Sequence, residues 1–294
     1  MGSCERRDDM RRSINIAAGL LLLAGSAAAA STQVPWDRID GGSSLKEIER
    51  EIVAEVLGQA KCYGGCGETV LACLQKNPDD KIAKRLAAFA VRRVKADQDT
   101  PDILQEIEDR RLSAFPPKVF TPDLSGTRVC GDPKAPVKVV LYADFGCPYC
   151  KATATSLRSL LGKEPKRLAF YFKNYPLKSH DQAVPAALAV LAAERQGKFW
   201  EMHDLLYEED QNLGETYFES CASKLGLDLA RFRSDQKEKG LLDRLRAEKM
   251  EGIQFGVEKT PGILVNGKFY RGVRTWEELL DRIEEEGDLI AAGL

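Results

Sequence analysis

The spacing of apolar and polar residues predicts two regions with different secondary structure. Up to about residue 113, apolar residues recur at helical spacing in short segments, for example from 45 to 56 and from 82 to 94. Short amphipathic helices cannot bury their apolar faces alone, so we expect a small helical bundle. From residue 136 onward the order is strand, helix, strand, long helical stretch, hairpin and helix, which is typical of an α/β domain.

Two predicted strands of the second region are continuous apolar and β-branched runs, at 136–145 and 168–172. A hairpin is predicted at 263–270, because its centre, Asn266-Gly267, accepts the positive φ angles of a type I′ turn. Further helices are expected at 181–209, 217–225 and 229–251.

Capping boxes mark the starts of two predicted helices. In such a box a Ser or Thr and a Glu three residues later satisfy each other's free backbone donors. Ser44 and Glu47 form the first box, and Thr275 and Glu278 form the box of the last helix.

The N-terminus has the pattern of a secretory signal peptide over residues 1–30. Two arginines precede an apolar run at 14–23, and Ala28 and Ala30 form a small-residue cleavage site. The alternative is an uncleaved anchor in the inner membrane, because residues 14–30 nearly reach membrane-spanning length. Either interpretation predicts a periplasmic or other extracytoplasmic protein in an oxidising compartment.

Composition narrows the class of protein further. Charged residues make up 30% of the chain with a net charge of −2, and no basic stripe interleaved with aromatics is present, so we expect no nucleic-acid partner. The length of 294 residues suits two modest domains. We therefore expect a signal peptide at 1–30, a small all-α cysteine-containing domain at 31–113, a proline-rich linker at 114–126 and an α/β domain at 127–294.

The cysteine count indicates disulfide chemistry. Removal of Cys4 with the signal peptide leaves seven cysteines, and an odd number in an exported protein implies at least one unpaired thiol or a mixed disulfide. The seven are Cys62, Cys66, Cys73, Cys130, Cys147, Cys150 and Cys221.

Candidate catalytic residues lie where the first predicted strand gives way to a helix, in the sequence Cys147-Pro148-Tyr149-Cys150. A helix N-terminus stabilises a thiolate, which is the reactive form of cysteine. Cys147 is therefore the expected exposed nucleophile, and Cys150, one turn later, is the expected resolving thiol. The alternatives are an inert disulfide or half of a zinc site. Zinc would need two further ligands, and no His is near in sequence, so we expect neither metal nor cofactor.

The residues from Phe145 to Cys150, together with the later Thr260-Pro261-Gly262, resemble the DsbA-type branch of the thioredoxin superfamily over about residues 127–290. The resemblance implies a thioredoxin-like fold with a helical insertion. It also implies a cis Pro261 opposite the cysteines, with Thr260, Pro148 and Tyr149 binding the substrate peptide. Glutaredoxins also carry this cysteine motif, but here Pro261 follows Cys150 by 111 residues of helical character.

One departure from the resemblance is Leu141, which occupies the position of a buried acidic residue in several relatives, so proton handling at Cys150 is expected to differ. The histidines His180 and His203 are interpreted as surface or helix-boundary residues, because cysteine exchange needs no histidine base once the thiolate is formed.

The earlier cysteine-rich segment at 60–69, followed by helices, resembles the helical domain of CcmH-type cytochrome c maturation proteins, which carry a redox cysteine pair. It departs from them because three residues separate Cys62 and Cys66, where two are usual, and because Cys73 is additional. Either a second redox pair or a structural disulfide is therefore expected among these three cysteines. Cys130 and Cys221 are a further candidate pair, and sequence does not fix the connectivity.

The leading hypothesis is an enzyme, an exported protein thiol–disulfide oxidoreductase of the DsbA-like oxidase type. Its expected partners are protein substrates with cysteine thiols and a recycling membrane redox partner of the DsbB, VKOR or DsbD type. Two alternatives stay open at this point. One is a disulfide reductase or isomerase in cytochrome c maturation that acts on apocytochrome c, and the other is a non-catalytic substrate-binding module.

Overall fold

The computed structural model describes residues 34–208 and 213–294, and the chain divides into unit 1, residues 1–108, and unit 2, residues 109–293. The predicted signal peptide at 1–30, with Cys4, lies outside the described residues. Within the described ranges, no helix combines the length and apolar character needed to cross a membrane. The predicted domain boundaries at residues 113 and 126 stay a prediction.

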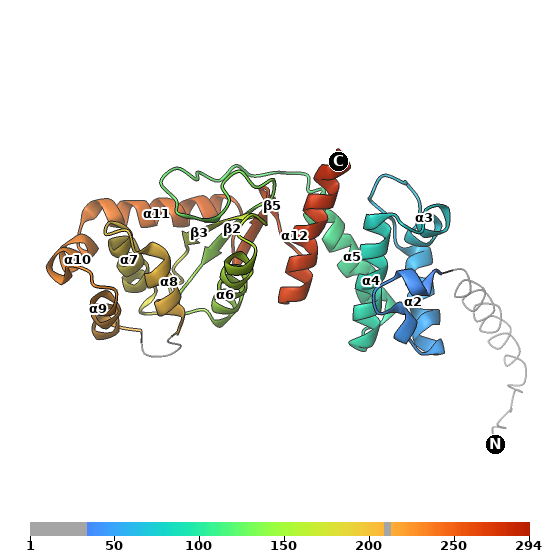
Figure 1. The fold of residues 1–294 in the computed structure, drawn as a ribbon, viewed down its shortest axis with the longest axis horizontal. Helices are drawn as coiled ribbons and strands as arrows, with labels where there is room; N and C mark the ends of the chain where they lie inside the picture. Colours follow the sequence, from blue (N-terminus) through green and yellow to red (C-terminus); the bar gives the residue numbers. More distant parts are fainter. Residues whose placement is uncertain (1–33, 209–212) are drawn as a thin grey trace, which may run out of the picture. The chain divides into compact units, whose positions relative to one another are not determined.

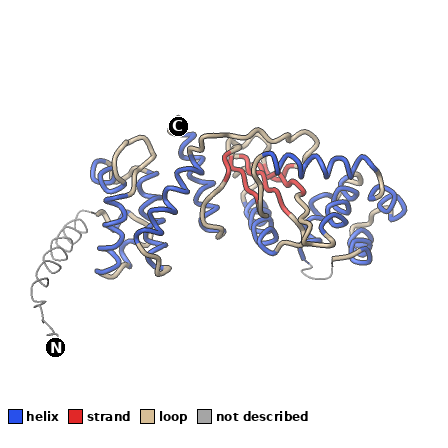
Figure 2. Tube along the Cα trace, turned by 180° about the vertical axis from the view of Figure 1, so that it is seen from behind, coloured by secondary structure: helices blue, strands red, loops and turns tan. Residues whose placement is uncertain are grey.

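Unit 1 is helical over its described residues, as the apolar spacing predicted (Figure 2). Fully buried residues such as Val53, Leu74 and Leu86 come from three different helices and form its core. The elements are η1 (Trp36–Arg38), η2 (Gly42–Ser44), α2 (Glu47–Gln59), α3 (Val70–Lys76), α4 (Lys81–Lys95) and α5 (Thr100–Ala114), whose last residues belong to unit 2.

The predicted capping box of Ser44 and Glu47 is wrong. The Ser44 hydroxyl donates to the carbonyl of Gly41 at 2.8 Å, within a turn that precedes the helix. Helix α2 instead begins after Lys46, whose backbone N–H donates to the Glu49 carboxylate at 2.7 Å.

Unit 2 is built on a five-stranded mixed sheet in the order β1-β3-β2-β4-β5. Strands β3, β2 and β5 of this sheet are labelled in Figure 1. The central strand β2 pairs parallel with β3 and antiparallel with β4, so that Leu141 lies between Phe172 and Ile263. Burial on both faces explains why this strand reads as a continuous apolar run. The strands are β1 (Val129–Gly131), β2 (Lys138–Ala143), β3 (Ala169–Asn174), β4 (Gly262–Val265) and β5 (Lys268–Phe269).

Each face of the sheet is covered by different segments. The face that carries Val139 packs on α6 (Pro148–Lys163), on α12 (Trp276–Ala291) and on the helices inserted between β3 and β4. The opposite face, which carries Tyr142, packs on residues 120–124 and on the C-terminal part of α11. Gly252 of α11 permits this approach, because a Cβ there would lie 2.8 Å from the ring of Tyr175.

The inserted helices are more interrupted than the sequence predicted. The stretch expected to be helical at 181–209 is divided by Gly197, whose φ of +78° ends the first helix. The stretch expected at 229–251 is likewise two helices. The observed elements are α7 (Ala183–Glu194), α8 (Phe199–Glu208), α9 (Glu215–Lys224), α10 (Leu229–Gln236) and α11 (Lys239–Gln254).

The predicted hairpin and the start of the last helix are confirmed. Asn266 and Gly267 join β4 to β5 with φ angles of +50° and +77°, as a type I′ turn requires. The Thr275 side chain accepts the backbone N–H of Glu278 at the start of α12.

Candidate active site

Cys147 and Cys150 lie at the beginning of α6, where the chain leaves the central strand. Cys147 immediately precedes the helix, and Pro148 is its first residue, where a missing N–H and a fixed φ cost nothing. Neither cysteine is in a disulfide. Cys147 is only 6% exposed, so the expectation of an exposed nucleophile is wrong. Its sulfur lies 3.6 Å from the backbone oxygen of Thr260, which helps to cover it.

The two thiols differ strongly in acidity. The pKa of Cys147 is lowered to about 5, chiefly by a hydrogen bond from the Cys150 side chain and further by the Thr260 side chain and backbone amides, against the opposing effect of burial. Burial raises the pKa of Cys150 well above its usual value, and the neighbouring Cys147 raises it further. At neutral pH this arrangement gives one thiolate nucleophile and one protonated donor.

The loop between β2 and α6 is pinned by a buried carboxylate, Asp144. The two carboxylate oxygens accept the backbone N–H groups of Gly146 and Leu177, each at 2.6 Å. The backbone carbonyl of Asp144 accepts the N–H of Cys147 at 3.1 Å. His180, just before α7, places Nδ1 3.1 Å from the same carboxylate. Sequence reasoning missed Asp144, although a carboxylate three residues before the first cysteine was the available signal.

The two histidines prove to have different environments. His180 lies at a helix boundary, as expected, but it contacts the active-site loop: a Cβ at Gly146 would lie 3.2 Å from its ring. His203 is 1% exposed, so its interpretation as a surface or boundary residue is wrong. Burial lowers the pKa of His203, and its ring packs edge-on against those of Phe145 and Phe172.

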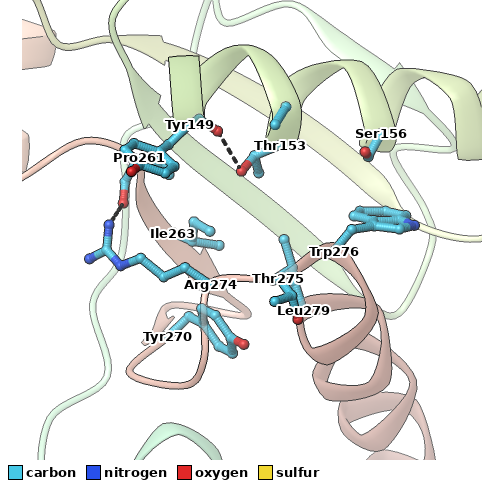
Figure 3. Close-up of a pocket in the computed structure, with 11 residues that line it drawn as sticks. Tyr149, Thr153, Ser156, Pro261, Ile263, Tyr270, Arg274, Thr275, Trp276 and Leu279 are labelled. Carbon is cyan, nitrogen blue, oxygen red and sulfur yellow. Dashed lines mark hydrogen bonds between the residues drawn. The ribbon is translucent and has the colours of Figure 1, made fainter. Parts of the chain in front are cut away.

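An apolar pocket adjoins the cysteine motif (Figure 3). The Thr260–Pro261 peptide bond is cis, as the resemblance implied, and Pro261 lines this pocket together with Tyr149, which is 69% exposed. Arg274 donates to the Pro261 carbonyl at 3.2 Å. The remaining lining residues are Ala152, Thr153, Ser156, Ile263, Tyr270, Thr275, Trp276 and Leu279.

The pocket contains some of the predicted site residues and adds others. Pro148 and Thr260 are not among its lining residues, although they adjoin Tyr149 and Pro261 in sequence. Trp276 and Leu279 of α12 were not predicted. Both residues lie at the start of the last helix, which the capping box predicted. The sequence did not indicate that this helix begins beside the cysteine motif.

The other cysteines form no second pair in unit 2. Cys130 and Cys221 are both outside disulfides, so the candidate pair between them is not formed. In unit 1, Cys66 and Cys73 form a disulfide, and Cys62 is not part of it. One of the disulfide pairings that the sequence left open is thereby defined.

A mixed sheet whose central strand leads to two cysteines at a helix start defines the class of thioredoxin-like thiol–disulfide oxidoreductases. A family model described as thioredoxin matches residues 123–285, more than half of the chain, and the chain belongs to this family. The predicted family, fold class and enzyme class are thereby confirmed. The match does not reach the cysteines of unit 1, so the resemblance of that region to CcmH-type domains stays a prediction.

Solved structures share this fold. A thioredoxin-like oxidoreductase from Silicibacter pomeroyi DSS-3 superposes with a TM-score of 0.51 at 24% identity, over 60% of this chain and 98% of that one. The thiol–disulfide exchange protein α-DsbA2 from Wolbachia pipientis gives a TM-score of 0.50 at 17% identity, over 62% of this chain and 94% of that one.

Relatives in sequence include much longer proteins. The Na⁺/H⁺ antiporter NhaA 3 of Salinispora tropica is 37% identical over 152 residues, which make up 51% of this chain and 23% of the antiporter. The chain therefore spans less than a quarter of the length of that relative, and the likeness concerns one segment of it.

Proposed function

We propose that this chain is an exported DsbA-like oxidase that transfers a Cys147–Cys150 disulfide to the thiols of protein substrates. The observation that carries the proposal is the unequal acidity of the pair, with the pKa of Cys147 at about 5 and that of Cys150 raised. A stabilised Cys147 thiolate favours the reduced pair. A pair that is stable when reduced is a strong oxidant when it carries the disulfide.

The proposed reaction has two exchange steps. A substrate thiolate attacks Cys147, the Cys147–Cys150 bond breaks, and a substrate–Cys147 mixed disulfide forms while Cys150 leaves and takes up a proton. A second substrate thiolate then attacks the substrate sulfur of the mixed disulfide and displaces Cys147. The substrate loses two electrons, and the enzyme pair gains them. The low pKa of Cys147 assists the second step, because a thiol of low pKa is a better leaving group.

The pocket beside the motif supports a protein substrate. It is lined mainly by apolar and aromatic groups, it includes exposed Tyr149 at one edge, and it adjoins Pro261. An extended peptide whose cysteine reaches Cys147 would place a neighbouring apolar side chain there. In this proposal Pro148 and Thr260 complete the peptide site, as the resemblance implies.

The proposed setting is the periplasm or another extracytoplasmic space, reached through the signal peptide at residues 1–30. The Cys66–Cys73 disulfide supports it, because disulfides form and persist in oxidising compartments. A membrane redox partner of the DsbB, VKOR or DsbD type would complete the catalytic cycle. In the alternative proposal the chain is a reductase or isomerase that passes electrons to apocytochrome c. The following measurement distinguishes this alternative from the oxidase.

The decisive measurement is the reduction potential of the Cys147–Cys150 pair. Purified protein is equilibrated in glutathione buffers of defined ratio, quenched in acid and alkylated, and the peptide that contains both cysteines is quantified by mass spectrometry. We expect a value above about −200 mV, between the about −120 mV of DsbA and the about −180 mV of protein disulfide isomerase. A value near the about −270 mV of thioredoxin would overturn the oxidase and favour a reductase.

Variants test whether the chemistry belongs to the motif. Cys147→Ser should abolish oxidation of a reduced model protein, whereas Cys130→Ser, on β1 and outside the motif, should retain it. Equal activity of the Cys147→Ser variant and the parent would refute catalysis by the motif and favour a substrate-binding module.

A further inference from the structure

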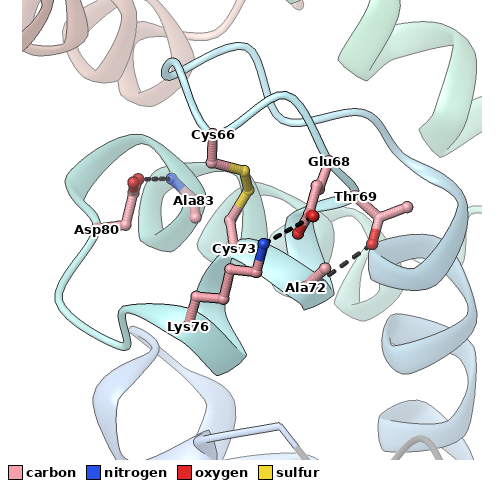
Figure 4. The surroundings of a disulfide bond; sticks show 8 residues. All are labelled: Cys66, Glu68, Thr69, Ala72, Cys73, Lys76, Asp80 and Ala83. Atoms are coloured by element: carbon pink, nitrogen blue, oxygen red, sulfur yellow. Dashed lines mark hydrogen bonds and ion pairs between the residues drawn. A yellow bond between two sulfur atoms is a disulfide. The ribbon is translucent and has the colours of Figure 1, made fainter.

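Three cysteines of unit 1 gather their sulfur atoms in one place. The sulfurs of Cys62, Cys66 and Cys73 all lie within 4.8 Å of one another. Cys66 and Cys73 form the disulfide drawn in Figure 4, and Cys62 lies outside it. A disulfide needs only two of these sulfurs, and Cys62 brings a third thiol donor to the same place.

The loop at 62–69 is shaped to hold this cluster. The backbone N–H of Cys62 donates to the carbonyl of Glu68 at 2.8 Å, which closes the loop at its base. Within the loop, Gly64 lies against α4 so closely that a Cβ would come 2.6 Å from Cβ of Ile82. The loop therefore turns back over α4, and Cys62 comes within reach of Cys73 on α3.

The cluster is shielded but not closed. Cys73 is 1% exposed and Cys62 is 5% exposed, whereas Cys66 is only partly buried. Two sulfurs are thus withheld from bulk water, and the third gives access from the surface. Burial of this kind limits the access of solvent to a metal–thiolate centre.

The donor atoms select the ion. Among the described residues, no His, Asp or Glu joins the three sulfurs of this cluster, and both histidines of the chain belong to unit 2. Structural zinc almost always takes four ligands, whereas soft thiolates alone suit Cu(I). We propose that the reduced cluster of Cys62, Cys66 and Cys73 binds one Cu(I) ion through three thiolates, and that the Cys66–Cys73 disulfide closes this site.

Opening the site is a two-electron step. The Cys66–Cys73 bond breaks as it accepts two electrons and two protons from an external dithiol, which becomes a disulfide. Cu(I) then replaces up to three thiol protons as three copper–sulfur bonds form, and its oxidation state does not change. Reoxidation of the pair by an external disulfide, which takes up the two electrons and two protons and becomes a dithiol, removes two of the three ligands and releases the ion as Cu(I). None of these steps depends on the proposed oxidase activity.

The test uses the full-length chain with Cys147→Ser and Cys150→Ser, so that the other close cysteine pair cannot bind copper. The reduced protein is titrated anaerobically with Cu(I) against bathocuproine disulfonate as a chromophoric competitor. We expect the reduced chain to bind one Cu(I) ion. When Cys66 and Cys73 are oxidised, the affinity for Cu(I) should be more than about 100-fold weaker. The loss of two direct ligands should lower the affinity more than a change among the residues around the ligands, which lowers metal affinity about 10–100-fold.

Matched variants assign the ligands. Adding Cys62→Ser should weaken binding more than about 100-fold while Cys66 and Cys73 can still form their disulfide, whereas adding Cys221→Ser should leave binding unchanged. Unaltered affinity in the Cys62→Ser variant would overturn the proposal.

X-ray absorption of the copper-loaded chain with Cys147→Ser and Cys150→Ser, which keeps Cys62, gives a measurement that does not depend on how any variant at Cys62 folds. Three sulfur scatterers are expected. Two sulfurs, or a preference for Zn(II) over Cu(I), would refute the three-thiolate copper site.

Discussion

The ionisation of Cys147 depends first on a hydrogen bond from its partner cysteine, and this dependence can be tested by two variants. Cys150→Ala removes the donor, whereas Cys150→Ser keeps an O–H group in nearly the same place. Both variants remove the resolving thiol equally. A difference between them therefore reports the hydrogen bond.

The size of the effect follows from the energy of such a bond. A hydrogen bond to a charged group contributes about 1.5–3 kcal/mol, and one pKa unit corresponds to about 1.4 kcal/mol. Its loss should raise the pKa of Cys147 from about 5 by roughly 1–2 units. The Cys150→Ser variant should stay within about one unit of the parent, because its hydroxyl can still donate.

The assay is the pH dependence of alkylation by iodoacetamide, followed by mass spectrometry of the peptide that contains Cys147. Resolution by peptide separates this thiol from the other cysteines of the chain. The reduced parent should give a midpoint near pH 5, with the Cys150→Ala midpoint clearly above the Cys150→Ser midpoint. Identical midpoints in the two variants would refute the hydrogen bond as the main cause of the lowered pKa.

Three further predictions concern stability. Folding lowers the pKa of Cys147 from 9.0 to about 5, so the thiolate stabilises the reduced protein relative to Cys147→Ala above about pH 9. This difference in the free energy of unfolding, measured with urea, should disappear as the pH falls to about 5. Asp144→Ala, which leaves two backbone N–H groups without their carboxylate, should cost about 3 kcal/mol, and a cost below about 1 kcal/mol would contradict that role. Arg110→Met should cost about 3–5 kcal/mol, because the buried Glu285 and the partly buried Asp281, at 3.0 and 2.7 Å, would lose this cation; unchanged thermal unfolding would contradict this.

Features governed by neighbouring residues could be predicted from the sequence. The turn at Asn266 and Gly267 depends on the φ angles that these two residues accept, and the start of α12 depends on the Thr275 side chain. The position of Cys147 at a helix start could be predicted for the same reason, because an apolar strand and a proline define it locally.

Features that depend on distant pairing could not be predicted in this way. The short strand β1 exists because Val129 pairs with Tyr171, and three residues give too little pattern to show this alone. The burial of Cys147 depends in part on Thr260, which lies more than a hundred residues later in the chain. Trp276 reaches the pocket only because the fold brings α12 alongside α6.

The two thiols of the motif are coupled in a way that makes the mixed disulfide drive its own resolution. Burial raises the pKa of Cys150, and the neighbouring Cys147 adds to this through its charge and through the hydrogen bond that it accepts. In the recycling step of the proposed cycle, Cys147 is bonded to a sulfur of the redox partner, so its negative charge is gone and it accepts that hydrogen bond only weakly. The pKa of Cys150 then falls, which favours attack of Cys150 on Cys147 and release of the partner's sulfur. The same hydrogen bond that helps to ionise Cys147 in the reduced enzyme therefore withholds Cys150 until the mixed disulfide with the partner has formed.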